Sequence, residues 1–283
     1  LGATGVVGQR FVQLLAEHPW FTLCALAASD RSAGRSYADA CRWLLPGPMP
    51  EAAAGLEVWP LEPELDCRLV FSALPAEVAG SVEERFAAAG YAVCSNTSAH
   101  RMDADVPLLI PEMNPDHTAL IDGQRRRRGW SGCIVAAPNC SSTQVALALK
   151  PLHDAFGLQR LSIVTLQAVS GAGYPGLSAL DILDNVIPFI DGEEDKLERE
   201  PTKLLGRLNG DGIVPAAVAV SAQCNRVPVR DGHTACVALA AERAPSAAEA
   251  AEALTAFRVT PEVAALPSTP PRQSGSSAIR KPG

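Results

Sequence analysis

The chain has 283 residues, of which 47% are hydrophobic and 19% are charged. This length and composition allow two modest globular domains, each with a buried core. The formal net charge of −7 argues against a nucleic-acid partner, because binding to a phosphate backbone requires a cationic surface. The one basic run, Arg125 to Arg128, is short, and we interpret it as a solvated turn.

Membrane and disulfide-rich classes of protein are also disfavoured. No stretch reaches the roughly 20 apolar residues that span a bilayer, and the first residues lack the order of a signal peptide, so we expect no membrane partner and a cytoplasmic location. The eight cysteines include no C-x-x-C pair and lie mostly in apolar runs, where cysteine behaves as a small hydrophobic residue. Neither a disulfide framework nor a metal site is predicted.

The first half alternates short apolar runs with helical patterns, which is typical of a parallel sheet built from strand-helix-strand units. The expected elements are, in chain order, a helix at 5–18, a strand at 21–28, a loop at 29–35, a strand at 69–73, a helix at 78–89 and strands at 92–95 and 133–136. Almost no strand precedes the first helix, so the chain looks truncated at its front. This order predicts a Rossmann-like, doubly wound dinucleotide-binding domain over residues 1–137.

The second half changes character after Pro138. The expected elements are a helix at 141–156, a strand at 161–169, a helix at 177–186, an acidic stretch at 192–200, strands at 214–222 and 234–242, and a helix at 247–257 capped by Ser246. Long strands separated by loops predict an α+β domain with a mixed sheet over 138–266 that carries the substrate chemistry. Residues 267–283 are rich in Pro, Ser and Gly and are expected to be disordered.

A glycine-rich turn opens the chain with LGATGVVG, in a G-x-x-G-x-x-G arrangement. Glycines at a strand-to-helix turn let the backbone approach a pyrophosphate, and the helix start supplies free amide donors. Glycines that merely ease a turn are the alternative. The candidate cofactor-binding residues of this turn are Gly2, Thr4, Gly5, Val6, Val7 and Gly8.

The position that reads the ribose, about 20 residues beyond such a turn, is occupied by Ser29-Asp30-Arg31-Ser32. An arginine flanked by Ser29 and Ser32 suits a 2′-phosphate, which favours NADP over NAD. Two alternatives stay open. Asp30 could hydrogen-bond a free ribose hydroxyl, and Arg31 could be an ordinary solvated residue.

The candidate nucleophile is Cys140, in the segment APNCSST between an apolar strand and a helix. The dipole and free amides of a helix start stabilise a thiolate, so we expect a lowered pKa for Cys140. The other seven cysteines lack this strand-turn-helix setting. A purely structural cysteine is the alternative.

A thiolate needs a proton acceptor and donor that works near pH 7, and histidine is the natural residue. His233 is the candidate, because it follows a constrained loop, NRVPVRDG, that also presents Arg226. By spacing alone, a simple turn histidine is equally compatible. The remaining histidines are interpreted as surface residues, namely His18, His100, His117 and His153.

Six motifs in order resemble the aspartate-semialdehyde dehydrogenase family, particularly its archaeal and fungal branch. They are LGATGVVGQRF at the start, SNTSAHR at 95–101, APNCSST at 137–143, QAVSGAGYPG at 167–176, EREPTK at 198–203 and NRVPVRDGH at 225–233. The resemblance covers nearly all of residues 1–266. It implies a homodimer or homotetramer and NADP as cofactor.

The resemblance also implies roles for individual residues. Cys140 would be the nucleophile, His233 the acid and base, and Gln167 the residue that holds the reacting carbonyl. The implied substrate contacts are Arg226 for the α-carboxylate, Glu200 for the α-ammonium, and Arg101, Lys203 and Asn139 for phosphate. Further cofactor contacts would come from Ser72, Ser170, Gly171 and Gly173. As alternatives, Glu200 and Lys203 could form a helix-surface ion pair, and the glycines after Gln167 could form a plain turn.

The implied reaction is reversible and needs no metal. The Cys140 thiolate would attack aspartate semialdehyde, a hydride would pass to NADP, and phosphate would release aspartyl phosphate from the thioester. Three alternatives remain: an N-acetylglutamyl-phosphate reductase, a malonyl-coenzyme A reductase type of enzyme, and an inactive fragment that lacks the last part of the cofactor pocket. If NADP reduction depends on phosphate, the aspartate-semialdehyde dehydrogenase reaction is supported. If it depends on coenzyme A, the malonyl-coenzyme A reductase type is supported.

Overall fold

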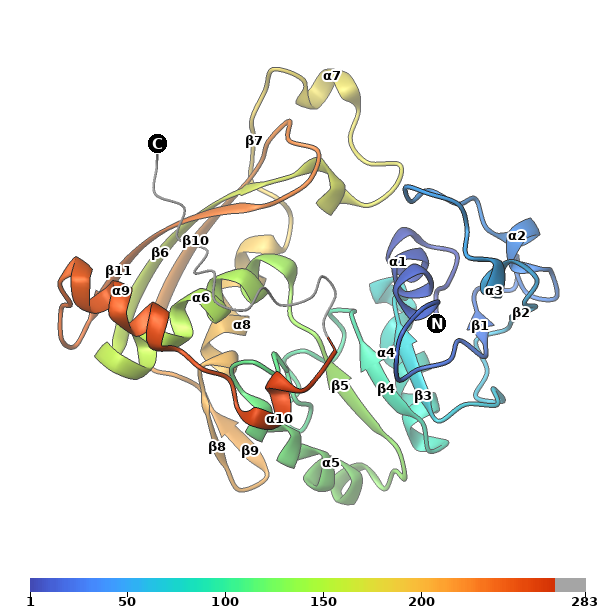
Figure 1. Ribbon diagram of the computed structural model, residues 1–283, viewed down its shortest axis with the longest axis horizontal. Helices are drawn as coiled ribbons and strands as arrows, with labels where there is room; N and C mark the ends of the chain where they lie inside the picture. Colours follow the sequence, from blue (N-terminus) through green and yellow to red (C-terminus); the bar gives the residue numbers. More distant parts are fainter. Residues whose placement is uncertain (268–283) are drawn as a thin grey trace.

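The computed structural model describes residues 1–267, which form an α/β structure with a parallel sheet in the first half and a mixed sheet in the second (Figure 1). The disorder expected for 267–283 falls almost entirely outside these residues. No helix in the described part of the chain is long and apolar enough to cross a membrane.

The parallel sheet of the amino-terminal half is made of β3 (Leu69–Ser72), β4 (Ala92–Ser95) and β5 (Cys133–Ala136), in that order. Strands in a parallel sheet are covered on both faces and read as continuous apolar runs, which is why these three were predicted with nearly their observed bounds. The helices that pack on this sheet are α4 (Ala76–Ala88) and α5 (Leu120–Arg128). The Rossmann-like expectation is confirmed.

The glycine turn joins this sheet to a smaller parallel pair, β1 (Leu26–Ala27) and β2 (Val58–Trp59). The Leu1 amine donates to the Phe71 carbonyl, and the Gly2 amide donates to the carbonyl of Ala27. The strand expected at 21–28 is therefore wrong in length. Beyond this short stretch, an apolar cavity of about 310 Å³ separates residues 22–25 from 67–71, and no ladder forms across it.

Helix α1 (Val6–Leu15) follows the turn, as predicted but shorter than 5–18. The remaining short elements of this half are α2 (Tyr37–Ala40), α3 (Glu51–Ala54) and the 3₁₀ helix η1 (Pro115–Ala119).

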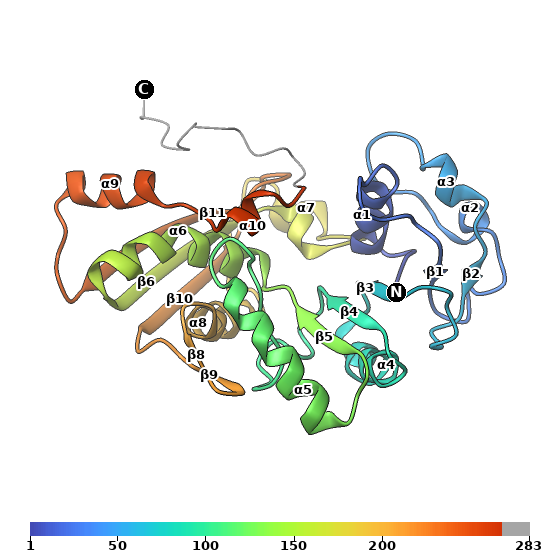
Figure 2. The ribbon, with the colours of Figure 1, turned by 60° about the horizontal axis from the view of Figure 1, so that its bottom comes forward.

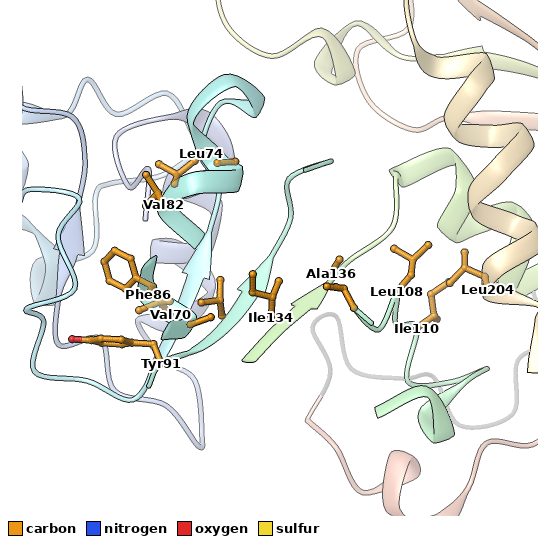
Figure 3. Close-up of a cluster of buried hydrophobic side chains, with 14 of the residues drawn as sticks. Val70, Leu74, Val82, Phe86, Tyr91, Leu108, Ile110, Ile134, Ala136 and Leu204 are labelled. Atoms are coloured by element: carbon orange, nitrogen blue, oxygen red, sulfur yellow. The ribbon is translucent and has the colours of Figure 1, made fainter. Parts of the chain in front are cut away.

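The main hydrophobic core lies between α4, the parallel sheet and the loop that follows β4 (Figure 3). Phe86 and Ile134 are fully buried in it. Leu204, from a helix of the second half, packs into the same cluster beside Leu108. The two halves consequently share a core and position one another.

The second half is built on a four-stranded mixed sheet in the order β11, β6, β10, β7. Its strands are β6 (Leu158–Gln167), β7 (Ile187–Pro188), β10 (Ala219–Arg226) and β11 (Thr234–Ala241). Helices α6 (Cys140–Phe156) and α8 (Glu193–Leu204) pack together along one side of this sheet, and α9 (Ala247–Ala256) packs on α6 (Figure 2). The predicted Ser246 cap of α9 is confirmed, with Glu249 completing a capping box. The mixed sheet is confirmed.

Several elements of this half differ from expectation. The helix expected at 177–186 is a single turn, α7 (Ala179–Ile182), and β10 begins later than 214 because Val214 belongs to the hairpin β8 (Arg207–Asn209) and β9 (Gly212–Val214). The acidic stretch is the start of α8, since acidic residues favour a helix amino terminus. The other short elements are η2 (Val169–Ala172) and α10 (Pro261–Ala264).

The basic run at 125–128 is not a turn. It forms the last turn of α5, where cations complement the helix dipole. Arg128 reaches back to Asp105, Asp103 and Glu84 at 2.7, 2.8 and 2.9 Å. These ion pairs, and not solvation alone, account for the position of Arg128.

Candidate active site

Cys140 is the first residue of α6, directly after β5 and its short loop, as predicted. Asn139 caps this helix, because its side-chain oxygen accepts from the amides of Ser141 and Ser142 at 2.9 and 3.3 Å. Cys140 itself is exposed, whereas Ser141 and Ser142 behind it are buried. The residue is thus accessible at the helix start, although the surrounding protein partly removes water from its thiol.

The expectation of a lowered pKa for Cys140 is wrong in this state. Burial raises the pKa of the Cys140 thiol, and the negative charge of Glu193 raises it further. Hydrogen bonds from Ser141 act in the opposite direction but do not outweigh these two effects. The effect of the helix start on the thiol pKa is therefore smaller than the combined effect of burial and the Glu193 charge. The sequence patterns did not reveal that Glu193 lies near Cys140.

His233 precedes β11, and its Nδ1 accepts a hydrogen bond from the Ala168 amide at 3.0 Å. A neutral ring in this position carries its proton on Nε2. Burial lowers the pKa of His233, the Arg226 charge lowers it further, and Glu193 opposes both. The imidazole is consequently a neutral Nε2 proton donor near pH 7.

Arg226 and Gly171 lie against His233. Arg226 is the last residue of β10 and donates to the Ala168 carbonyl at 2.8 Å, so the backbone of one residue, Ala168, holds both side chains through the two peptide groups on either side of its α-carbon. A β-carbon on Gly171 would lie 2.8 Å from Nη1 of Arg226 and 3.0 Å from Cε1 of His233. Only glycine fits here without displacing them, which explains this residue as more than a turn former.

Glu193, the first residue of α8, is a site residue that the sequence analysis missed. Its carboxylate accepts from Asn139 at 2.9 Å, from Lys196 at 2.7 Å and from Gln167 at 3.4 Å. It also acts electrostatically on both Cys140 and His233. Glu193 therefore links Cys140, His233 and Gln167 in one cluster.

Glu200, near the other end of α8, is 2% exposed and has two protein partners. It accepts from Nη1 of Arg101 at 3.0 Å and from the backbone amide of Asn139 at 2.7 Å. Arg101 also donates to the Asn96 carbonyl. The alternative of a surface ion pair is excluded, because Glu200 is a buried link between α8, the loop after β4 and the helix start at Cys140.

Lys203 is 5% exposed and donates all three ammonium hydrogens to the protein. Its acceptors are the carbonyls of Arg101, Asp103 and Val106 at 2.8, 2.7 and 2.8 Å. Burial lowers the pKa of Lys203 to about 8, opposed by Asp103, Asp105 and Glu200. Contact between Lys203 and a phosphate therefore requires release of one carbonyl.

Two histidines that were interpreted as surface residues are buried. His100 and His117 are 6% and 1% exposed. His100 bonds to Asp103 at 2.9 Å, and His117 lies 2.9 Å from Nδ2 of Asn114. Hydrogen bonds to polar partners of this kind offset the free energy lost when an imidazole is removed from water. These partners cannot be identified from a single sequence.

Two of the turn glycines are required by packing and the third is not. A β-carbon on Gly2 would lie 2.7 Å from the Ala73 carbonyl oxygen, and one on Gly8 would lie 2.1 Å from that of Gly2. At Gly5 the nearest atom would be 3.6 Å away. A small side chain would therefore fit at position 5, and the exposed Gly5 leaves the backbone at the start of α1 accessible to a phosphate.

The other candidate cofactor residues surround this turn. Ser72 ends β3, is fully buried, and its hydroxyl has no hydrogen-bond partner within the described structure. Ser29 and Arg31 are exposed, and Ser29 accepts from the Ser32 amide in the loop after β1. The turn residues Thr4, Val6 and Val7 lie at the surface of the same region.

Ser170 and Gly173 line a groove of about 520 Å³ that also contacts Val6 and Arg10 of α1. This groove places the loop after β6 opposite the glycine turn. It connects the two sets of candidate residues.

Two family models match the chain. The model for the semialdehyde dehydrogenase NAD-binding domain matches residues 1–121, and that for the semialdehyde dehydrogenase dimerisation domain matches residues 149–275. An aspartate-semialdehyde dehydrogenase from Archaeoglobus fulgidus is 52% identical over 91% of this chain and 75% of its own length. The chain belongs to the aspartate-semialdehyde dehydrogenase family. The resemblance drawn from the six motifs is confirmed.

Further members of the aspartate-semialdehyde dehydrogenase family support this placement. The protein from Cryptococcus neoformans is 47% identical over 95% of this chain and 78% of its own length. The crystal structure of the Candida albicans enzyme with NADP matches with a TM-score of 0.85 and 43% identity, over 93% of this chain and 77% of that one. Aspartate-semialdehyde dehydrogenase II from Vibrio cholerae, complexed with ASA, matches with a TM-score of 0.70 and 29% identity, over 90% and 77%.

Proposed function

We propose that this protein is an NADP-dependent aspartate-semialdehyde dehydrogenase that converts L-aspartyl 4-phosphate into L-aspartate 4-semialdehyde and phosphate, reversibly. Family membership supports the substrate class. The observation that carries the proposal is the cluster around Glu193, which unites Cys140, Gln167 and His233 at the start of α6. The N-acetylglutamyl-phosphate and coenzyme A reductases are not favoured.

The residues at the glycine turn fit a dinucleotide. The exposed Gly5 leaves the start of α1 accessible to a pyrophosphate, and the buried Ser72 hydroxyl has no hydrogen-bond partner among the described residues. Arg31 and the serines beside it are free to meet a 2′-phosphate, and the Candida albicans relative was solved with NADP. Bound NADP would accept or supply the hydride.

The covalent half of the reaction follows from the residues of the chain. Sγ of Cys140, once ionised, attacks the acyl carbon of aspartyl phosphate, the C–O bond to phosphate breaks, and a thioester remains. The backbone amide of Cys140 can stabilise the oxyanion that forms during attack, whereas those of Ser141 and Ser142 already donate to Asn139. His233 donates its Nε2 proton to the oxygen or sulfur that gains charge, and recovers it in the reverse direction.

The two charged ends of the substrate have matching partners. Arg226 offers the remaining nitrogens of its guanidinium to the α-carboxylate, while one nitrogen stays fixed on Ala168. We assign the α-ammonium to Glu193 in place of Glu200. Glu193 is close to Cys140 and partly exposed, whereas both oxygens of Glu200 are already used inside the protein.

Arg101 and Lys203 were implied as phosphate ligands, together with Asn139. The contacts of Arg101 and Lys203 support a different primary role, which is to hold the loop at 96–106, and Arg101 also binds Glu200, which accepts from the Asn139 backbone amide next to Cys140. Asn139 is the member of this set that reaches the cluster, through Glu193. We propose that Arg101 and Lys203 act as positioning residues.

The test is NADP reduction by the purified chain with aspartate semialdehyde. We expect the rate to depend on phosphate and to be unaffected by coenzyme A. Cys140→Ser should lower kcat by about 1000-fold or more, because a hydroxyl is a far weaker nucleophile. Cys236→Ser, at another exposed cysteine, is the matched control and should retain activity. Coenzyme A dependence would identify the rival acyl reductase.

A dimerisation domain among the matches supports an oligomer. We propose a homodimer or homotetramer. Light scattering after size-exclusion chromatography should give two or four times the 29.6 kDa of one chain. A single-chain mass at micromolar concentration would contradict this assembly.

A further inference from the structure

Arg42 and Tyr174 meet between the two halves of the molecule. Nη1 of Arg42 lies 2.9 Å from the Tyr174 hydroxyl, and the guanidinium carbon lies 5.5 Å from the centre of the ring. Tyr174 is 57% exposed, so this contact is formed at the surface. Figure 1 shows the loop between β6 and α7 reaching toward the amino-terminal half beside α1.

On the amino-terminal side, Arg42 is fixed to the glycine turn through Gln9. The Gln9 side chain is fully buried and donates to the carbonyls of both Thr4 and Arg42 at 3.0 Å. Its oxygen accepts from the Leu44 amide at 2.8 Å. Arg42 therefore keeps a constant position relative to the start of α1.

On the other side, Tyr174 follows the residues that contact His233. The Val169 and Ser170 amides donate to the carbonyls of residues 229 and 230, which anchors the base of this loop. Gly171 packs on His233, and Tyr174 lies three residues later. Gly173 and Gly176 lie on either side of it with φ of 70° and 84°, in the left-handed region that glycine adopts readily.

The groove of about 520 Å³ lies beside this contact. Val6 and Arg10 form its amino-terminal wall, and Ser170, Gly173 and Tyr174 form the opposite wall. A dinucleotide with its pyrophosphate at the exposed Gly5 and its nicotinamide toward Gly171 would run along these walls. Tyr174 belongs to one wall, and Arg42, which lies two residues before Leu44 of the facing wall, binds it beside the groove.

We propose that Arg42 and Tyr174 form a latch that closes the groove over the bound dinucleotide and slows its release. The identity of the ligand, NADP, rests on the proposed function. The contact between Arg42 and Tyr174 rests on the geometry alone. Neither residue takes part in the covalent chemistry. Both are positioning residues that couple the glycine turn to the loop carrying Gly171.

The latch itself is tested on the ligand-free full chain by hydrogen exchange. Arg42→Ala should speed amide exchange in residues 173–177 and leave β6 unchanged. Arg85→Ala, which removes an ion pair with Glu62 elsewhere on the same half, is the control and should change neither. Unchanged exchange in 173–177 would overturn the latch.

Its effect on the cofactor is tested by stopped-flow dissociation of NADPH. Arg42→Ala and Tyr174→Ala should each raise the dissociation rate about two- to fivefold, the factor that matches an exposed cation–π contact of about 0.5–1 kcal/mol. Tyr174→Phe keeps the ring and should have a smaller effect. The double variant should be no faster than the faster single one.

The outcomes separate the two proposals. Additive effects, or dissociation rates equal to that of the unmodified chain, would overturn the role of the latch in retention. If the unmodified chain binds no NADPH while Arg42→Ala still speeds exchange in 173–177, the proposed function fails and the latch stands.

Discussion

The two ends of helix α8 carry similar charges in opposite settings. At its start, Glu193 is 13% exposed and shares its oxygens among the side chains of Asn139, Lys196 and Gln167. At its end, Glu200 and Lys203 are buried and their polar atoms are used up inside the protein. A ligand can replace one hydrogen-bond partner of Glu193 at a small cost in free energy. At Glu200 or Lys203 it would have to break buried hydrogen bonds that hold the fold together.

The largest effect that we predict is on stability, at the buried end. Lys203→Met keeps the stem but leaves three buried carbonyls without their donor, at about 1–3 kcal/mol each. The free energy of unfolding in urea should fall by at least about 3 kcal/mol. Lys196→Met, at the exposed end, should cost no more than about 1 kcal/mol. Equal losses would remove the distinction between the two ends.

A large effect on catalysis is predicted at Gly171. In Gly171→Ala the new methyl group displaces Arg226 and His233, and a shift of about 1 Å in such groups costs on the order of 100-fold in kcat/KM. The melting temperature should change little, because Gly171 is exposed. Gly212→Ala meets no atom closer than 4.0 Å and serves as the control. Full activity of Gly171→Ala would argue against His233 as the acid.

A smaller effect is predicted at the exposed end of α8. Glu193→Gln removes the charge proposed to bind the α-ammonium, so KM for aspartate semialdehyde should rise about tenfold or more. The melting temperature should stay close to that of the parent. Asp195→Asn, two residues along on the exposed side, is the matched control. If Glu200→Gln raised KM without loss of stability and Glu193→Gln did not, our assignment would be reversed.

The smallest effect concerns the reactivity of the thiol. The Glu193 charge helps to raise the pKa of Cys140, so Glu193→Gln should lower that pKa and make alkylation at pH 7.5 severalfold faster. Iodoacetamide labelling with mass-spectrometric mapping measures this, and the exposed Cys236 is the internal reference. An unchanged ratio of Cys140 to Cys236 labelling would show that the Glu193 charge does not reach the sulfur.

Much of the fold could be predicted because it depends on local patterns. Continuous apolar runs fixed β4 and β5 to the residue, and the helical spacing of apolar residues after the turn placed the start of α6 within one residue. The strand expected at 21–28 was wrong in length because the length of a strand depends on the chain that it pairs with, and β1 pairs with β2 only at Leu26 and Ala27. The helix at 177–186 was wrong because its apolar residues face solvent, with Leu180 91% exposed.

The candidate site also has a part that local patterns predict and a part that they do not. Cys140 and His233 were found from a motif and its context, but the partners of each side chain depend on residues far away in the sequence. Glu193 was passed over because an acidic stretch resembles any solvated helix start, and its contacts with Asn139 and Gln167 cross 54 and 26 residues. Burial of Lys203 against carbonyls about 100 residues away is equally invisible in a pattern.

Ala168 limits how this candidate site can change. Its amide donates to the His233 imidazole and its carbonyl accepts from the Arg226 guanidinium, and these two peptide planes meet at one α-carbon, so a shift of the Ala168 backbone moves both side chains. The distance between the imidazole and the guanidinium is thereby set by the backbone. A variant that accepts a longer or shorter substrate must therefore change a residue on another element. Glu193 at the start of α8 is such a residue, because its exchange leaves the distance between His233 and Arg226 unchanged.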